Sequence, residues 1–352
     1  MNHMRILFVG DLNEYGRSFQ RNETLKELGH NIYALSHVPV PFFGGRDKPP
    51  LFSRILWKFG LPYDMTGINR KVRKEIATQH FDLIWIENGV TVRPSTLRYI
   101  KRHAKDTTLI SVSEDDMYAK HNRSKYYEWG LKYYDVVFTT KTYNLEELKS
   151  LGAKHTELFL DSYDEYMHKP MQLTESERAR FSCDVSAIGA FEKERAESLL
   201  YLSEHGIKVV VWGSGWGAWV GRHKNLDVKN EFLFGADYAK AISATKINLN
   251  FLRKINRDEV TSRSVEIPAC GGFMLGERTM RHLGFFEEGK EAEFFNSNEE
   301  LLQKVGYYLE HDEKRRQIAF AGRDRCLKTE YSMRAQLSGI LEKLLHSSIH
   351  IY

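Results

Sequence analysis

The chain has 352 residues, which is room for about two domains of roughly 150 residues each. Hydrophobic residues make up 42% of it and charged residues 28%, ordinary globular values that exclude disordered, collagen-like and coiled-coil chains. The 51 lysines and arginines outnumber the 47 acidic residues by a net charge of only +4, which is too small to indicate a nucleic-acid partner.

The sequence indicates neither export nor a membrane span. The longest uncharged stretch, Val209–Gly221, is shorter than a bilayer span and rich in glycine. The opening residues predict a strand and not a signal peptide. Cys183, Cys270 and Cys326 have neither the spacing of a metal motif nor that of a disulfide framework, so we expect a reducing, cytoplasmic location.

In the first half of the chain, short apolar runs alternate with helical patterns, which is typical of a parallel sheet with crossover helices. Each run is almost continuously apolar, as expected for strands that are covered on both faces. The predicted strands are Arg5–Val9, Ile32–Leu35, Asp82–Ile86, Thr108–Val112 and Asp135–Thr139, and the predicted helices include Phe19–Leu28, Ile68–Thr78 and Leu145–Leu151.

The alternation starts afresh after a polar stretch at residues 161–182. Its predicted strands are Asp184–Ile188, Lys208–Trp212, Lys246–Asn250 and Gly272–Leu275, and its predicted helices include Glu192–His205, Glu299–Leu309, Glu313–Cys326 and Met333–Leu345. We therefore predict an α/β fold of two doubly wound, Rossmann-like domains facing a cleft. The predicted domains are residues 1–165 and 183–330, with a linker at 166–182 and a C-terminal helix and tail at 331–352.

One segment, residues 38–63, interrupts this alternation. It holds five of the eight prolines, and Leu51, Ile55 and Phe59 recur in it at i, i+4 and i+8 with cationic residues between them. This pattern predicts a short cationic amphipathic helix. Packing of this helix on the first domain and contact of this helix with an acceptor or a membrane surface are both open interpretations.

Glycines follow several predicted strands, at the edge where open α/β sheets bind ligands. Gly213, Gly215 and Ala218 match the dinucleotide fingerprint G-x-G-x-x-A. The residues that follow are poor helix formers, however, and the motif comes after the second strand of its domain instead of the first, which argues against a dehydrogenase. We expect Gly189, Gly213 and Gly215 to let the backbone approach a ligand closely.

Residues 246–277 carry the strongest chemical signal. Arg253, Arg263 and Glu266 follow a predicted strand within a single crossover. The forked donors of arginine match phosphate oxygens, and a carboxylate can accept from the two hydroxyls of a ribose. These residues predict a site for a nucleoside diphosphate, and the alternative is a surface Arg–Glu pair on a short helix. The small residues 270–272 favour the ligand site because they allow close packing beneath it.

This stretch resembles the carboxyl-terminal domain of GT-B glycosyltransferases, in particular the CgeB-like (spore-maturation) branch of the family 1-like enzymes. The likeness covers most of residues 184–340 and, more loosely, 1–160. The matching residues are Arg263, Glu266, Pro268–Gly272, Phe273–Leu275, Phe285–Glu291, Glu300–Leu301, Ala319–Arg323 and Tyr331–Arg334.

The resemblance implies that the second domain binds a nucleotide sugar and the first an acceptor, and that the final helix returns to the first domain. Glu266 matches the ribose-binding carboxylate of the family. The residues expected at the diphosphate and along the donor site are Arg253, Arg263, Gly189, Gly213 and Gly215.

The outcome of the reaction at the sugar carbon stays open. Many retaining members place a second carboxylate eight positions before the ribose-binding one, and this chain has Asp258 there, one methylene shorter than glutamate. Pro268 also lies inside the predicted helix, where it removes a backbone hydrogen bond. Both departures affect the expected contact with the sugar.

In the first domain, Glu114-Asp115-Asp116 follows a predicted strand. Asp115 and Asp116 are the preferred bases for an acceptor hydroxyl. The alternatives are a helix cap and a metal site. Because two arginines and a helix end can neutralise a diphosphate, we expect that no metal is required.

The leading hypothesis is a metal-independent glycosyltransferase of the EC 2.4 type, active in the cytoplasm. We expect a UDP-sugar as donor and a glycan, a protein or a small molecule as acceptor, with no nucleic-acid partner and with peripheral membrane contact through residues 38–63. The alternatives are a non-catalytic nucleotide- or sugar-binding protein on the same fold and an oxidoreductase or epimerase that modifies a nucleotide sugar.

Overall fold

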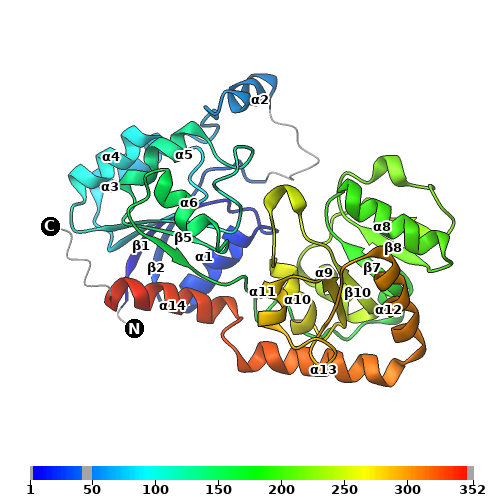
Figure 1. Ribbon diagram of the computed structural model, residues 1–352. Coiled ribbons are helices and arrows are strands. Elements are labelled where there is room, and N and C mark those ends of the chain that lie inside the picture. The colour runs from blue at the N-terminus through cyan, green and yellow to red at the C-terminus, as the bar shows by residue number, and fades with distance from the viewer. Residues whose placement is uncertain (1–2, 42–49, 347–352) are drawn as a thin grey trace. The chain divides into compact units, whose positions relative to one another are not determined.

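The computed structural model describes residues 3–41 and 50–346 and divides the chain into two compact units. The first unit comprises Met1–Leu160 with Gln336–Tyr352, and the second comprises Asp161–Ala335. Each unit is built on one six-stranded sheet with helices on both of its faces (Figure 1). The predicted α/β fold with two doubly wound sheets is confirmed.

The sheet of the first unit has the strand order β2-β1-β3-β4-β5-β6, and all neighbouring strands are parallel. Its strands are β1 (Arg5–Gly10), β2 (Asn31–Ser36), β3 (Leu83–Glu87), β4 (Thr108–Ser113), β5 (Val136–Thr139) and β6 (Thr156–Leu158). The helices of this unit before residue 160 are α1 (Arg17–Glu27), α2 (Leu51–Lys58), α3 (Ile68–Thr78), α4 (Pro94–His103), α5 (Lys125–Gly130) and α6 (Asn144–Ser150).

The sheet of the second unit has the order β12-β11-β10-β7-β8-β9 and is likewise parallel throughout. Its strands are β7 (Cys183–Ile188), β8 (Val209–Trp212), β9 (Leu226–Val228), β10 (Thr245–Asn250), β11 (Met274–Glu277) and β12 (Glu293–Phe295). The helices are α7 (Glu175–Phe181), α8 (Lys193–Glu204), α9 (Gly235–Ala244), α10 (Ser262–Ala269), α11 (Met280–Phe285), α12 (Asn298–Glu310) and α13 (Asp312–Lys328).

The central strands are apolar because both of their faces are covered. All five residues of β3 are buried, and so are Ile6, Leu7, Phe8 and Val9 of β1, which lies beside it. Strands of this kind cannot show the alternation of a half-exposed strand. The continuous apolar runs in the sequence therefore predicted the central strands correctly.

In each sheet, the order of the strands reverses at one point. In the first unit the chain winds outward in both directions from β1 and β3, and in the second unit from β7 and β10. At such a point the loops that leave the two strands diverge to opposite faces of the sheet and open a crevice at their carboxyl ends. Each unit therefore has one favoured place for a ligand.

The last helix, α14 (Met333–His346), begins in the second unit and continues in the first. Leu337, Ile340 and Leu341 on it are almost fully buried. The chain passes between the units twice. The two crossing segments are bonded to each other within each unit: in the first, Leu160 N donates to Gln336 Oε1 at 2.7 Å, and in the second, Tyr163 forms a β-bridge with Ser332.

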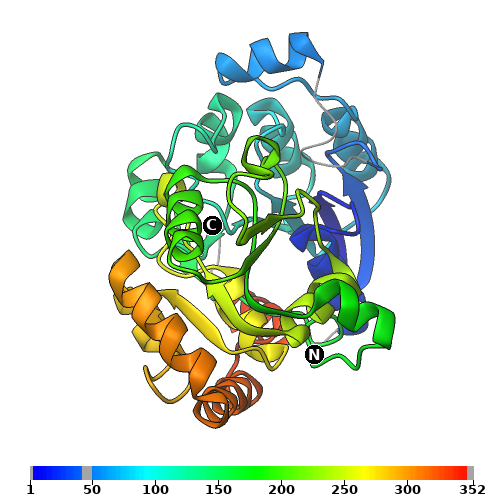
Figure 2. The ribbon, with the colours of Figure 1, turned by 90° about the vertical axis from the view of Figure 1, so that its right-hand side faces the viewer.

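The predicted amphipathic helix in residues 38–63 corresponds to α2, whereas residues 42–49 of that segment lie outside the described residues. In both views α2 projects from the rest of its unit (Figure 1, Figure 2). None of the described helices combines the length and the apolarity that a bilayer span requires.

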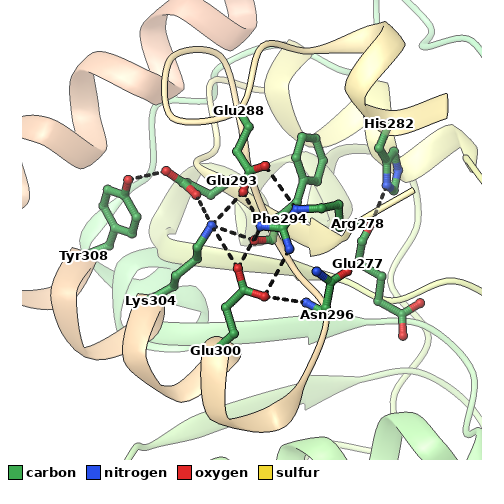
Figure 3. A network of polar contacts seen from close by, with 10 residues as sticks. All are labelled: Glu277, Arg278, His282, Glu288, Glu293, Phe294, Asn296, Glu300, Lys304 and Tyr308. Atoms are coloured by element: carbon green, nitrogen blue, oxygen red, sulfur yellow. Dashed lines mark hydrogen bonds and ion pairs between the residues drawn. The ribbon is translucent and has the colours of Figure 1, made fainter. Parts of the chain in front are cut away.

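A network of charges joins β11, β12 and α12 (Figure 3). Arg278 forms ion pairs with Glu288 and Glu300, and Lys304 with Glu288, Glu293 and Glu300. Each of these cations has two or more carboxylate partners, so the charges are neutralised locally. We assign this network a structural role, fixing the edge strand β12 to the helix that follows it.

Beside this network, the buried side chain of His282 links β11 to α10. Its Nδ1 lies 2.6 Å from the carbonyl oxygen of Glu277, and its Nε2 lies 2.7 Å from Ser264 Oγ. Because a carbonyl oxygen only accepts, Nδ1 carries the proton and Nε2 accepts from the serine hydroxyl. Burial lowers the pKa of His282 to about 4.

This histidine makes stability depend on pH. Between pH 6.5 and about 4 the unfolded chain binds a proton at His282 that the folded chain does not, so the stability present above pH 6.5 is lost as the pH falls. We expect the free energy of unfolding to lose about 1.4 kcal/mol per pH unit from this group. Denaturant unfolding at a series of pH values measures it.

In His282→Gln the slope in this range should be shallower by about one proton than in the wild type. An unchanged slope in His282→Gln would contradict this account of the buried imidazole.

Candidate functional site

The crevice of the second unit opens at the end of β7, where the chain leaves through a glycine turn, and the neighbouring strand β8 ends in a second glycine turn. Gly189 N donates to Trp212 O at 2.8 Å, which brings the two turns side by side. A Cβ atom on Gly213 would lie 1.9 Å from Gly189 O, so no side chain fits at that position. Gly215 has φ +84°, a conformation that favours glycine. The structure thus brings together the three glycines that the sequence placed at one site.

Arg195, in the first turn of α8, points into this turn. The residue is only 5% exposed, and its Nη1 donates to Ala190 O at 2.5 Å. Its Nη2 is buried and has no hydrogen-bond partner among the described residues. A Cβ on Gly189 would lie 2.6 Å from Nη1, so the glycine also makes room for the guanidinium.

Two further arginines lie near the same turn. Arg263 Nη1 would be 3.8 Å from a Cβ on Gly189, and this half-buried side chain forms no hydrogen bond or ion pair within the described part of the chain. Arg253, after β10, donates through Nε to Glu192 Oε1 at 2.9 Å. Arg253 and Arg263 therefore both lie near the glycine turns.

The electrostatics of this cluster favour an anion. Burial and the neighbouring charge of Arg263 lower the pKa of Arg195 to about 10. A buried cation with an unpartnered N–H group and a second cation beside it is unfavourable unless a counter-charge arrives. A phosphate or diphosphate would accept from the free Nη2 and offset the repulsion between the arginines. The cluster thus has the chemistry of a phosphate site.

Glu266 lies one turn after Arg263 on α10 and is buried. Its Oε2 accepts from the Tyr238 hydroxyl at 2.7 Å, and its Oε1 lies 3.8 Å from His168 Nε2. Asp164 N donates to His168 Nδ1 at 2.9 Å, so the ring proton sits on Nε2, facing the carboxylate. Burial and the charge of Glu266 raise the pKa of Tyr238 well above its usual value. These neighbours fix the orientation of the carboxylate.

Asp258 lies in the loop before α10 and is 9% exposed. Its Oδ1 accepts from Asn256 Nδ2 at 3.0 Å, and its backbone N donates to Arg253 O at 3.1 Å. These bonds fold the loop that carries Arg253 back toward the start of the helix. Pro268 lies in the last turn of α10, which continues to Ala269 despite the missing backbone donor.

The crevice of the first unit is a cavity of about 290 Å³, here called the polar cavity. Its lining residues come from the ends of several strands and the start of α1, and are Asp11, Gly16, Arg17, Ser18, Arg21, His37, Glu87, Asn88, Glu114 and Asp115. Arg21, almost fully buried, forms ion pairs with Glu87 at 2.6 Å and with Glu114 at 2.6 Å. Its positive charge is therefore already neutralised.

The three residues of the acidic triplet after β4 lie in three different environments. Burial would raise the pKa of Glu114, but Arg17 and Arg21 lower it to about 2. Asp115 lines the polar cavity. Asp116 is fully buried, and its Oδ1 accepts from Asn144 Nδ2 at 2.8 Å as well as from two backbone N–H groups of its own loop. Within the described residues, no group of three or more potential metal ligands forms a metal site.

The sequence analysis did not identify Arg195, Tyr238, His168 or Arg21 as site residues. Arg195 closes the turn that begins at Gly189, and an arginine in the first turn of a helix that follows a glycine after a strand was the available signal. Tyr238 and His168 reach Glu266 across 28 and 98 positions of sequence, and no spacing rule connects them.

Residues 195–342 match a family model described as glycosyl transferase-like. The matched region begins at Arg195 and contains Arg253, Asp258, Arg263 and Glu266. No match was found among curated protein sequences.

Solved structures share the fold at low sequence identity. Sucrose-phosphate synthase from Thermosynechococcus elongatus has a TM-score of 0.68 and 12% identity, covering 98% of this chain and 100% of that one. Anabaena HepE, solved with UDP and glucose, has a TM-score of 0.64 and 12% identity over 97% and 100% of the two chains. A putative UDP-N-acetylglucosamine 2-epimerase from Listeria monocytogenes has a TM-score of 0.59 and 11% identity over 98% and 97%.

These likenesses establish the fold, so the chain has the GT-B architecture. The family match and the fold together support transfer of a glycosyl group from a nucleotide sugar.

The unpartnered Arg195 gives a prediction that requires no ligand. Arg195→Met keeps most of the packing volume, loses one hydrogen bond and removes a buried charge, so the free energy of unfolding should stay level or rise by about 1 kcal/mol. Denaturant unfolding of the ligand-free protein measures this difference.

The control is Leu199→Ala, which truncates a fully buried side chain on the same helix and should cost about 2–5 kcal/mol. If Arg195→Met lowers the free energy of unfolding as much as the control does, the arginine stabilises the fold. That result would contradict its assignment as an unsatisfied anion-binding group.

Proposed function

We propose that this chain is a glycosyltransferase that binds a nucleotide sugar in the second unit and transfers its sugar to an acceptor bound in the polar cavity of the first. The observation that carries the proposal is the buried Arg195, with its unpartnered Nη2, beside Arg263 and the Gly189 turn. The glycosyl transferase-like match over residues 195–342 supports it. The motifs within residues 263–275 resemble those of the CgeB-like branch.

The geometry supports the following roles in donor binding. Arg195 and Arg263 bind the diphosphate oxygens and Arg253 lies at the outer edge of the site, while Gly189, Gly213 and Gly215 let the diphosphate approach the backbone. Glu266, oriented by Tyr238, accepts from the ribose hydroxyls. We propose a UDP-sugar as donor, since HepE, which shares the fold, was solved with UDP and glucose.

In the reaction, the bond between the sugar carbon and the diphosphate oxygen breaks, and the acceptor oxygen forms a new bond to that carbon. The negative charge that develops on the diphosphate lies beside the arginines, which stabilise it without a metal ion. Asp115, on the wall of the polar cavity, takes the proton of the acceptor hydroxyl. Asp116 holds the loop of Asp115 in place, and Asp258 contacts the sugar.

Because nucleotide sugars are metabolites of the cell interior, we place the activity in the cytoplasm. Two other functions on this fold remain as outcomes of the test. A non-catalytic module would bind the nucleotide without turnover. An epimerase, the activity for which the Listeria neighbour is named, would alter the sugar without transferring it.

The test combines binding with turnover. UDP and inorganic pyrophosphate should each raise the thermal midpoint of the full chain, with a gain of about 2.7 kcal/mol at 100 times the dissociation constant. Arg263→Lys keeps the charge but loses the forked donors, so it should weaken UDP binding about tenfold or more. Release of UDP from UDP-glucose in the presence of acceptor mixtures should continue in excess EDTA.

The matched control is Arg316→Lys, at an exposed position on α13, which should leave UDP binding unchanged. Equal UDP affinity in Arg263→Lys and the wild type would contradict the donor site. Loss of turnover in EDTA that manganese restores would overturn only the claim that the arginines stabilise the leaving diphosphate without a metal ion.

A further inference from the structure

The helix α2 (Leu51–Lys58) shows its apolar side to solvent. None of its residues is buried. Leu51, Phe52, Ile55 and Phe59, which follows the helix, are 69%, 61%, 44% and 63% exposed. In a helix of 3.6 residues per turn these four side chains form one continuous arc. An amphipathic helix of a globular protein normally turns this side toward the core, whereas the apolar side of α2 is left uncovered.

The exposed surface continues beyond the helix. Phe52 packs against Tyr63 at 5.9 Å between ring centroids, and Tyr63 is itself 50% exposed. We call the surface of Leu51, Phe52, Ile55, Phe59 and Tyr63 the apolar patch. Contiguous exposed apolar surface of this kind marks an interaction site in a soluble chain.

The end of α2 is fixed to the unit that carries it. Lys125 N donates to Gly60 O at 2.8 Å, which ties the turn after α2 to the start of α5. The turn at Gly60 has φ +73°, a conformation that suits glycine. This backbone hydrogen bond holds the carboxyl end of the helix against its unit.

A cavity of about 380 Å³ lies beside this turn, and we call it the basic cavity. Its lining residues are Trp57, Lys58, Phe59, Gly60, Lys120, Arg123, Ser124, Lys125 and Glu128. Its one carboxylate, Glu128, forms an ion pair with Arg123 at 3.0 Å. Lys58, Lys120 and Lys125 form no ion pair with the residues that the structure describes, so the cavity carries an excess of positive charge beside the apolar patch.

We propose that the apolar patch and the basic cavity together dock the protein on the surface of an anionic lipid bilayer. The aromatic and aliphatic side chains of the patch enter the boundary between headgroups and acyl chains, and the lysines of the cavity bind lipid phosphates. Phe59 belongs to both the apolar patch and the lining of the basic cavity, so the two surfaces are continuous. The proposal is independent of the glycosyl transfer proposed above.

The charges argue against a second copy of the chain as the occupant. A two-fold contact through the apolar patch would place the same surface on both sides and bring Arg54, Lys58 and the cavity lysines of both copies together. An anionic bilayer instead supplies an apolar layer and opposite charge at the right places. It therefore satisfies both surfaces at once.

The test is cosedimentation of the full chain with vesicles. Binding is expected to vesicles of equal parts phosphatidylcholine and phosphatidylglycerol, and much weaker binding to phosphatidylcholine alone. Replacing Phe52 and Phe59 with serine should lower the partition coefficient about tenfold for each residue. The control is Phe320→Ser, a 73% exposed phenylalanine on α13, which should bind as the wild type does.

Reversing the charge of Lys120 or Lys125 to glutamate should weaken binding to the anionic vesicles several-fold, whereas Lys328→Glu, at an exposed site on α13, should not. The far-UV circular dichroism spectrum and the thermal midpoint serve as the measure of correct folding for every variant. Equal vesicle binding by the wild type and the double phenylalanine variant, or none by the wild type, would overturn the proposal. A dimer in sedimentation velocity that disappears in that variant would assign the patch to self-association instead.

Discussion

The buried guanidinium of Arg195 is the feature on which this account depends. One of its nitrogen atoms bonds to Ala190 O, another has no partner among the described residues, and Arg263 lies beside it. An unsatisfied buried donor costs about 1–3 kcal/mol, a large part of the 5–15 kcal/mol that stabilises a typical domain. The fold tolerates this cost because the parallel core beneath the site is continuous and apolar. Such strain is characteristic of sites that await a charged ligand.

The buried arginines of the two units have different partners, which supports separate roles for the two units. In the first unit, Arg21 lies between Glu87 and Glu114 and is neutralised by both. In the second, Arg195 and Arg263 have no carboxylate partner among the described residues. An anion therefore gains more in the second unit, whereas the polar cavity suits a neutral, hydroxyl-bearing molecule. This division matches a diphosphate-bearing donor and a sugar-like acceptor.

The sequence predicted the fold well because both sheets are parallel and buried. The longer strands were found almost residue by residue, although β11 begins two residues later than expected. The strands β6, β9 and β12 were not predicted, since three residues are too few to show a pattern. All three short strands lie at the edge of their sheet.

The site was predictable only where its residues follow one another in sequence. Arg263 and Glu266 share one turn of helix, so their joint position followed from the spacing. That Gly189 and Gly213 touch, and that Arg195 points between them, depends on the pairing of β7 with β8, which no local pattern shows. Likewise, the sequence showed an acidic triplet, but the separation of Glu114, Asp115 and Asp116 follows from partners far along the chain.

The most direct test of the central claim is a side-chain NMR titration of the full chain labelled with ¹⁵N-arginine, with the Arg195 signals assigned by comparison with Arg195→Met. If Arg195 is held for a diphosphate, its guanidinium signals should shift on adding UDP and also on adding pyrophosphate, but not on adding uridine. Binding of UDP that leaves the Arg195 signals unchanged would contradict the account.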